Sequence, residues 1–338
     1  MYSIGICGSL LKWFCSYLTG RSQHVVLEGS ISSPLPVSTG VPQGSVLGPL
    51  LFNIFINPLC NVPLSDGCQI FLYADDILLT KPISSTHDLH LFQGDLNAIA
   101  QWLESHRLSP NIKKTHLLPI TRSKATIKIS VFLNGKPLHS CGSVKYLGVT
   151  ITSDLSWATH ISNLCKKANR QLGLLHREFG SAPSSVKDKI YRCSILPTLE
   201  YCSAVWSPHC KTHKQSLERV ETFAARVVTR KWNLDRTTLL SSLHWPSLET
   251  RRKIQSLKVC YNIVNNLSII PSSYFLYHQH PSPRHPHSQI LYKPFAKTNS
   301  YMFSFFVNVV SMWNLLPSYA VVSSSPSVFK RHLSTLYH

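Results

Sequence analysis

Hydrophobic and polar positions follow two different periods along this 338-residue chain, and its first half contains both. Apolar residues recur at helical spacing over residues 5–19, which predicts an amphipathic helix that ends at a glycine. Residues 23–28 alternate as a half-buried strand does, again with a glycine after them. A loop punctuated by glycine and proline, residues 38–48, then precedes a mostly apolar helix predicted over residues 50–59.

Two short apolar runs, residues 69–74 and 77–80, predict strands separated only by Asp75 and Asp76. This spacing predicts a tight hairpin with two acidic side chains at its tip. The elements predicted next are a helix over residues 89–103, strands over 115–120 and 144–152, and a hairpin of 126–133 with 137–140 around an Asn-Gly turn.

The periodicity becomes helical from Trp157 to Lys231, and a second helical stretch runs over about residues 248–265. Residues 304–316 form an apolar segment that ends at Pro317. Strands followed by helices predict an α+β fold: an antiparallel sheet with helices, followed by helical regions. We therefore expect three regions: residues 1–157, a helical region over 158–235, and a mostly helical region over 236–338 with a Pro/His-rich loop at 279–288.

Charge is distributed unevenly along the chain, whose formal net charge is +19. Residues 1–80 contain two basic and four acidic side chains, whereas residues 81–338 contain 32 basic and 11 acidic ones. An acidic site followed by a long basic region fits metal chemistry beside a phosphate-rich partner such as nucleic acid. A membrane surface or a generic basic surface would fit the charge as well.

The ten cysteines contain no C-x-x-C pair, so we interpret them as reduced thiols of an intracellular, non-secreted protein, either nuclear or cytoplasmic. One group is a weak zinc candidate, because its spacing matches no standard zinc finger; it consists of Cys202, His209, Cys210 and His213. We expect no transmembrane helix, since the apolar run at residues 46–56 is too short and contains a proline.

Asp75 and Asp76 would repel each other at a hairpin tip unless a cation neutralised them. Carboxylate oxygens suit Mg²⁺, and a pair of such ions can support phosphoryl transfer. Taken alone, the two residues favour an ordinary turn over a metal site, because aspartate is a favoured turn residue.

Two sequence blocks change this balance. Gly40-Val41-Pro42-Gln43-Gly44-Ser45 precedes Tyr73-Ala74-Asp75-Asp76, each within a longer apolar context. In this order the blocks resemble motifs B and C of the reverse transcriptases of non-LTR, LINE-like retrotransposons. The resemblance continues along the chain. Residues 5–29 are similar to the region before motif B, 102–119 to motif D, and 144–149 to motif E, the primer grip. Residues 199–206 with 219–229 are similar to the helices after motif E, and 305–333 to the C-terminal segment.

The resemblance implies a fold and partners. Residues 1–157 would be a partial polymerase palm, 158–235 a thumb-like region and 236–338 the C-terminal region. The partners would be an RNA template, a DNA primer and deoxynucleoside triphosphates, and the cofactor Mg²⁺ at a two-ion site.

It also implies roles for individual residues. Asp75 would bind Mg²⁺ directly, with Asp76 as a supporting acid; Lys114 would protonate departing pyrophosphate, with Lys113 as the near alternative. The residues implied to contact substrate are Gln43 and Gly44 (incoming nucleotide and template base), Tyr73 and Ala74 (primer end), and Tyr146 and Gly148 (primer strand). The alternatives are a phosphate contact or no role for either lysine, and strand packing for Tyr146 and Gly148.

The family's motif A supplies a further metal-binding aspartate, which would lie upstream of residue 5. We therefore expect this chain to lack that ligand and the preceding fingers region, and to be inactive as an isolated polymerase, because loss of one ligand of a concerted site removes most of the rate. The competing hypotheses are a non-enzymatic nucleic-acid binder that uses the basic region 107–258, and a remnant that folds poorly.

Overall fold

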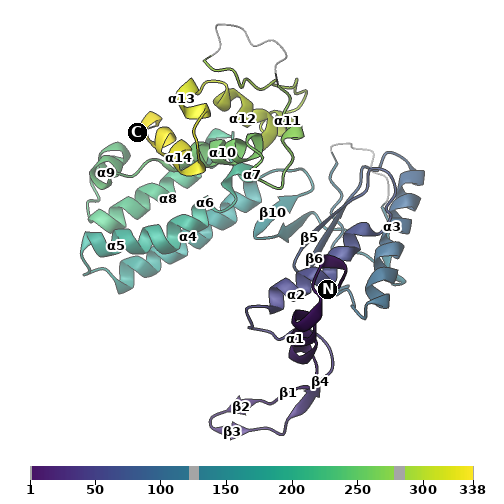
Figure 1. The fold of residues 1–338 in the computed structure, drawn as a ribbon. Helices are drawn as coiled ribbons and strands as arrows, with labels where there is room; N and C mark the ends of the chain where they lie inside the picture. The colour runs from purple at the N-terminus through teal and green to yellow at the C-terminus, as the bar shows by residue number, and fades with distance from the viewer. Residues whose placement is uncertain (1, 122–128, 278–285, 338) are drawn as a thin grey trace. The chain divides into compact units, whose positions relative to one another are not determined.

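The computed structural model describes residues 2–121, 129–277 and 286–337, and its α+β architecture confirms the predicted fold class. The chain forms two compact units, one comprising Met1–Leu117 with Ser123–Ser140 and the other Leu118–Arg122 with Cys141–His338 (Figure 1). Within the described ranges every sheet consists of two antiparallel strands. The predicted loop at 279–288 lies mostly outside the described residues, as does the start of the strand predicted over 126–133.

Among its described residues, unit 1 holds three α-helices and four antiparallel strand pairs. Its helices are α1 (Gly8–Leu18), α2 (Gly48–Ile56) and α3 (Thr86–Ser105). The strand pairs are β1 (Arg21–Gln23) with β4 (Leu35–Val37), β2 (Val26–Leu27) with β3 (Ser30–Ile31), β5 (Gln69–Tyr73) with β6 (Asp76–Thr80), and β7 (Phe132–Leu133) with β8 (Lys136–Pro137).

The core of unit 1 lies between the β5–β6 hairpin and helices α2 and α3. Ile56, Leu59, Ile99 and Leu103 are buried there, and the inward-facing side chains of the hairpin pack against them. Helix α3 begins three residues earlier than the periodicity predicts. A capping box starts it, in which the Ser85 hydroxyl accepts from the Asp88 N–H and the Asp88 carboxylate accepts from the Ser85 N–H.

Unit 2 opens with a hairpin of β9 (Ser143–Tyr146) and β10 (Val149–Thr152) and is helical thereafter. Its first helices are α4 (Ala158–Glu178), α5 (Ser184–Ile190), α6 (Leu196–Glu200), α7 (Ser203–Trp206) and α8 (Lys211–Thr229). They are followed by α9 (Arg236–Leu243), α10 (Leu248–Val264), α11 (Asn299–Met302), α12 (Phe305–Trp313), α13 (Ser318–Val321) and α14 (Pro326–Leu336).

Two apolar clusters form the core of unit 2. Helices α4 and α8 meet along one of them, where Leu172, Leu217 and Ala224 are fully buried. Helices α10, α12 and α14 enclose the other around Trp313 and Phe329. No helix in the part of the chain that the structure describes has both the length and the apolar character to cross a membrane.

Three predicted strands are wrong in detail. Residues 23–28 do not form one strand, because β1 ends at Gln23 and an exposed two-residue turn at Glu28 and Gly29 joins β2 to β3. Residues 115–120 form only an isolated bridge between Leu117 and Ser140.

The third wrong prediction is the single strand over residues 144–152. In the structure this segment forms two strands, β9 and β10, which pair as a hairpin. Leu147 and Gly148 form its turn with φ values of 45° and 85°. The alternating apolar positions shift from 144 and 146 before this turn to 149 and 151 after it. This change of phase was a signal that the prediction of one continuous strand missed.

Candidate active site

The β5–β6 hairpin presents both candidate carboxylates. Tyr73 pairs with Asp76, so the two turn residues are Ala74 and Asp75, one position earlier than predicted. Asp75 and Asp76 are both exposed, and neither carboxylate has a hydrogen-bond or ion-pair partner among the described residues. Tyr73 is 63% exposed and lies across the hairpin from Asp76, so the two side chains occupy one face.

The base of this hairpin is fixed to α3 by a buried polar network that the sequence did not indicate. The Asp95 carboxylate accepts from the Ser65 N–H at 2.7 Å and from the Ser65 hydroxyl at 2.6 Å. The Lys81 ammonium donates to the Ser65 hydroxyl and to the Asp66 carbonyl, each at 2.7 Å, and lies 4.0 Å from Asp95.

Cys68 belongs to the same network. Burial and its hydrogen bond to Asp95 raise the pKa of the Cys68 thiol to about 12. Burial also acts to raise the pKa of Asp95, but hydrogen bonds from Ser65 and Cys68 and the charge of Lys81 outweigh it, so this pKa is lowered. Because Cys68 precedes β5 and Lys81 follows β6, the network holds both ends of the hairpin.

The loop over residues 38–48 positions Gln43 and Gly44 on the surface of unit 1. Gly44 has a φ of 78°, and an added Cβ would meet no atom within 4 Å, so its backbone geometry, not crowding, favours glycine. The Ser45 hydroxyl donates to the Pro42 carbonyl and accepts from the Gly48 N–H. A Cβ on Gly48 would lie 2.7 Å from the Pro42 carbonyl oxygen, so this loop requires a small residue there.

Lys113 and Lys114 are both exposed on a turn that begins at Asn111. The Lys114 N–H donates to the Asn111 side chain at 3.2 Å. Neither ammonium contacts Asp75 or Asp76 among the described contacts, so Lys114 remains a prediction.

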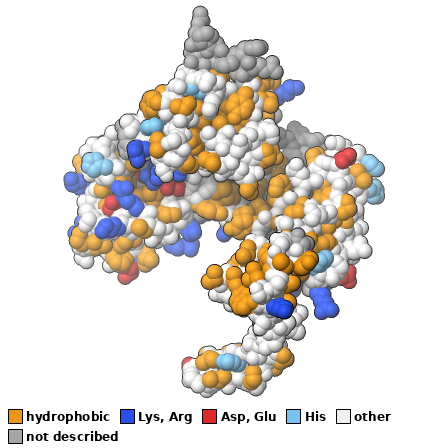
Figure 2. Space-filling view, in the orientation of Figure 1, with side chains coloured by type: hydrophobic (Ala, Val, Ile, Leu, Met, Phe, Trp, Pro, Cys, Tyr) orange, Lys and Arg blue, Asp and Glu red, His pale blue; other side chains and the backbone are white. Residues whose placement is uncertain are grey.

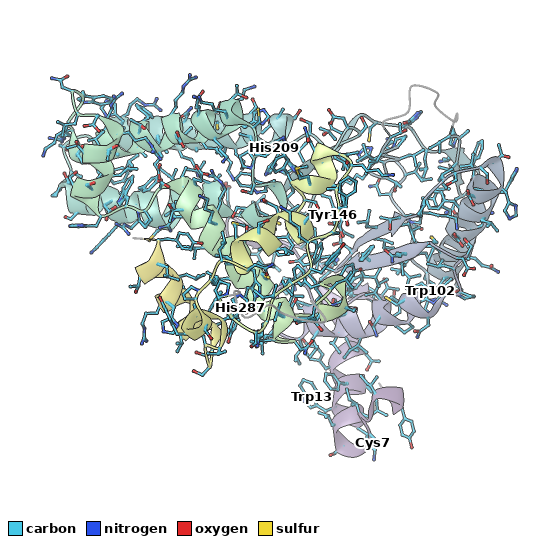
Figure 3. All side chains as sticks on the ribbon, turned by 90° about the horizontal axis from the view of Figure 1, so that it is seen from above. Cys7, Trp13, Trp102, Tyr146, His209 and His287 are labelled. Atoms are coloured by element: carbon cyan, nitrogen blue, oxygen red, sulfur yellow. The ribbon has the colours of Figure 1, made fainter. Side chains whose placement is uncertain are left out.

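Tyr201 holds the turn of the β9–β10 hairpin in unit 2. This residue lies in a segment that resembles the family, but the sequence predicted no role for it. The Tyr201 hydroxyl donates to the Leu147 carbonyl at 3.0 Å, and its ring lies 3.2 Å from where a Cβ of Gly148 would be. Tyr146, labelled in Figure 3, ends β9 and is partly buried.

His160 anchors the other strand of this hairpin. Its Nδ1 accepts from the Thr150 N–H at 3.2 Å, and burial lowers its pKa, which favours the neutral ring that this acceptor role needs. The candidate residues therefore fall into two groups. Unit 1 contains seven of them: Gln43, Gly44, Tyr73, Ala74, Asp75, Asp76 and Lys114. Unit 2 contains the other two, Tyr146 and Gly148.

Within the described ranges, no group of three or more His, Cys, Asp or Glu side chains is placed to hold a metal ion. The zinc candidate is not assembled: the His209 ring stacks on Phe303 at 4.1 Å, and Cys210 pairs with the Thr212 hydroxyl. The exposed pair Asp75 and Asp76 still fits Mg²⁺, which takes few protein oxygens and completes its shell with water and phosphate.

Comparison with known proteins points to one family. Residues 3–151 match the family described as reverse transcriptase (RNA-dependent DNA polymerase). The chain is 28% identical over 272 residues to the RNA-directed DNA polymerase from mobile element jockey of Drosophila melanogaster, covering 76% of this chain and 29% of that protein.

Two further relatives from the same fly agree. The probable RNA-directed DNA polymerase from transposon X-element is 27% identical over 231 residues, 66% of this chain and 25% of that protein. The corresponding protein from transposon BS is 26% identical over 294 residues, 84% of this chain and 32% of that protein. The chain thus spans about a quarter to a third of the length of these relatives.

Proposed function

Because residues 3–151 match the reverse transcriptase family and the chain is similar to the RNA-directed DNA polymerases of the jockey and X-element mobile elements, we propose that it carries part of the nucleotidyl-transfer site of such a polymerase. The observation that carries the proposal is the β5–β6 hairpin, whose tip presents two exposed, unpartnered carboxylates above an anchored base. A surface turn gains nothing from leaving two adjacent like charges uncompensated, whereas a site for divalent cations requires it.

In this proposal Asp75 and Asp76 hold Mg²⁺ with their free oxygens. The bound ions would activate the primer hydroxyl and stabilise the leaving oxygen of pyrophosphate. Tyr73, which shares a face with Asp76, supports the primer end, and Ala74 keeps the floor beneath it narrow.

The remaining candidates bind or orient the substrates. Gln43 and Gly44 shape the pocket for the incoming deoxynucleoside triphosphate and its template base. Lys114 donates the proton to pyrophosphate, with Lys113 as its alternative. Tyr146 and Gly148 hold the primer strand of the RNA–DNA hybrid, on a turn that Tyr201 supports.

We further expect the 338-residue polypeptide alone to extend primers weakly or not at all. The family resemblance calls for another aspartate in the site, and the described residues hold no third carboxylate beside the pair. An intracellular location, nuclear or cytoplasmic, is part of the same proposal; no disulfide links the cysteines in the part of the chain that the structure describes.

Primer extension on an RNA template with Mg²⁺ tests the proposal. The chain alone is compared with a fusion that carries the upstream region of a relative ahead of residue 1. We expect the fusion to extend primers, and Asp75→Asn to reduce its rate by about 10³-fold or more, as for other essential groups.

Asp66→Asn is the matched control, because Asp66 is an exposed aspartate of the same unit whose carboxylate has no role in the proposal. Equal activity of the Asp75→Asn and Asp66→Asn fusions would contradict the assignment of the site. A fusion that binds primer–template in a salt-dependent way but never extends it would favour the second candidate, a nucleic-acid binder without catalysis, which the excess of basic residues supports.

A further inference from the structure

An aromatic cluster lies at one end of unit 2, where α4 and α8 both finish. Trp232 lies three residues after the end of α8, and 46% of its surface is exposed. Its ring forms a T-shaped pair with the His176 ring, with centroids 5.7 Å apart, and a tilted pair with the Phe223 ring, with centroids 6.2 Å apart. Phe223 and His176 support the indole from two helices, so the ring is held in place while part of it stays open to solvent.

Basic residues flank these aromatic residues along the chain: Arg230 and Lys231 directly precede Trp232, and Arg177 follows His176. Arg177, Arg230 and Lys231 are exposed, and none of them forms an ion pair within the described residues. Arg230 ends α8 in the left-handed conformation with a φ of 59°, which turns the chain just before Lys231 and Trp232. Figure 2 shows Lys and Arg side chains gathered over this helical part of the molecule.

The positive charge of Arg230 also acts on Lys187, a neighbouring basic residue. Burial, and in second place the charge of Arg230, lower the pKa of Lys187 on α5. Glu178 is the acidic residue that adjoins Arg177 along α4. Like charges kept together without partners are unfavourable in the free protein, and a polyanion would relieve them.

We propose that this Trp232 surface, formed by His176, Arg177, Phe223, Arg230, Lys231 and Trp232, binds single-stranded nucleic acid. An unpaired base stacks on the exposed face of the indole, while Arg177, Arg230 and Lys231 contact the flanking phosphates. A base within a duplex has both faces covered and cannot reach the ring, so the surface selects unpaired nucleotides. The contact belongs to unit 2 and does not rest on the catalytic role of Asp75 and Asp76.

The test measures binding of a fluorescent oligo-dT of about 12 nucleotides, a length within the range that single-strand sites occupy, by anisotropy with the full chain. We expect Trp232→Ala to weaken binding on the order of 5- to 100-fold, the effect of losing one stacked base. Trp232→Phe retains an aromatic face and should restore most of the affinity. Trp13→Ala is the matched control: Trp13 on α1 is 50% exposed, and Figure 3 shows it projecting from that helix.

A second variant tests the charges. Replacing both Arg230 and Lys231 by glutamine should lower the slope of log affinity against log salt by about 1.4, since each single-strand phosphate contact contributes about 0.7. Thermal melts check that each variant is folded. Asp66→Asn, at an exposed position outside the proposed site, should leave binding unchanged. The readout is binding and not primer extension, so an error in the polymerase proposal would not affect this result.

Three outcomes would overturn the inference. One is equal affinity of folded Trp232→Ala and Trp13→Ala. Another is that Trp232→Ala lowers the affinity for a blunt DNA duplex as much as it lowers the affinity for oligo-dT, which would show that stacking on an unpaired base is not involved. The third is that Trp232→Ala weakens binding to vesicles of anionic lipid but does not weaken binding to the oligonucleotide.

Discussion

Ala74 adopts a backbone conformation that alanine disfavours. Its φ of 50° lies in the left-handed region, where the Cβ crowds the neighbouring carbonyl, yet the β5–β6 hairpin requires it for a two-residue turn. The pairing of Tyr73 with Asp76 and the packed inner face of the hairpin impose this geometry. Strain of this kind at the tip of a candidate site costs on the order of 1–3 kcal/mol.

Replacing Ala74 by glycine should therefore not destabilise unit 1, and we expect a change between 0 and about 1 kcal/mol in the stabilising direction. Relief of the left-handed strain offsets the greater entropy of glycine in the unfolded chain. Urea unfolding followed by circular dichroism measures the change. Ala98→Gly within α3 is the control and should cost about 1 kcal/mol; a similar loss at Ala74 would contradict the assigned strain.

The β5–β6 hairpin is anchored as an element, because the chain on either side of it meets α3. Ser65, Cys68 and Lys81 all contact Asp95, which is 4% exposed. A two-stranded hairpin is marginal by itself in water, so its stability depends on packing against α3 and on this network. The same network keeps Cys68 in its thiol form, because its pKa is raised to about 12.

Asp95→Asn should destabilise unit 1 by about 3 kcal/mol at pH 7, since it leaves Lys81 buried without its counter-charge. The pKa of Asp95 is lowered by folding, so its contribution is present above the ordinary value of 3.8 and is lost as the pH falls through the lower folded value. The stability difference between wild type and Asp95→Asn should accordingly narrow as the pH falls below the ordinary value of 3.8 and through the lower folded value.

Urea titrations at several pH values measure this difference. Asp66→Asn, at an exposed position, should stay within about 0.5 kcal/mol of wild type throughout. A difference for Asp95→Asn that does not change with pH would show that the charge of Asp95 is not the stabilising feature.

The whole molecule divides its apolar core unequally. Among the described residues, the two clusters of unit 1 contain four and three buried residues, whereas those of unit 2 contain nineteen and fourteen. Unit 1 also carries exposed apolar side chains on α1 and on the β2–β3 hairpin, including Trp13, Val26, Leu27 and Ile31 (Figure 2). Less apolar burial gives less stability, so the unit with the candidate carboxylates is the weaker of the two.

Unit 1 should therefore unfold at a lower urea concentration than unit 2, and unfolding should not be two-state. Hydrogen exchange read by mass spectrometry at increasing urea measures this. Amides of α3 should lose protection before those of α8. Loss of protection in both helices at one common urea midpoint would contradict the prediction.

Local patterns in the sequence were sufficient for the α+β class, the positions of most helices, the β5–β6 hairpin and the family. Helical spacing, turn residues and short motif blocks are properties of neighbouring residues, so they can be recognised without a structure. The capping box at Ser85 is equally local and was a missed signal that would have corrected the start of α3.

Tertiary structure alone decided the features that join distant residues. The turn at Leu147 and Gly148 is held by Tyr201, which lies 54 positions from Leu147, and the Asp95 carboxylate meets Ser65 across 30 positions. The cluster around Trp232 likewise depends on α4 and α8 ending side by side. Periodicity reports which face of an element is buried but not which partner buries it, because partners are chosen by packing over the whole unit.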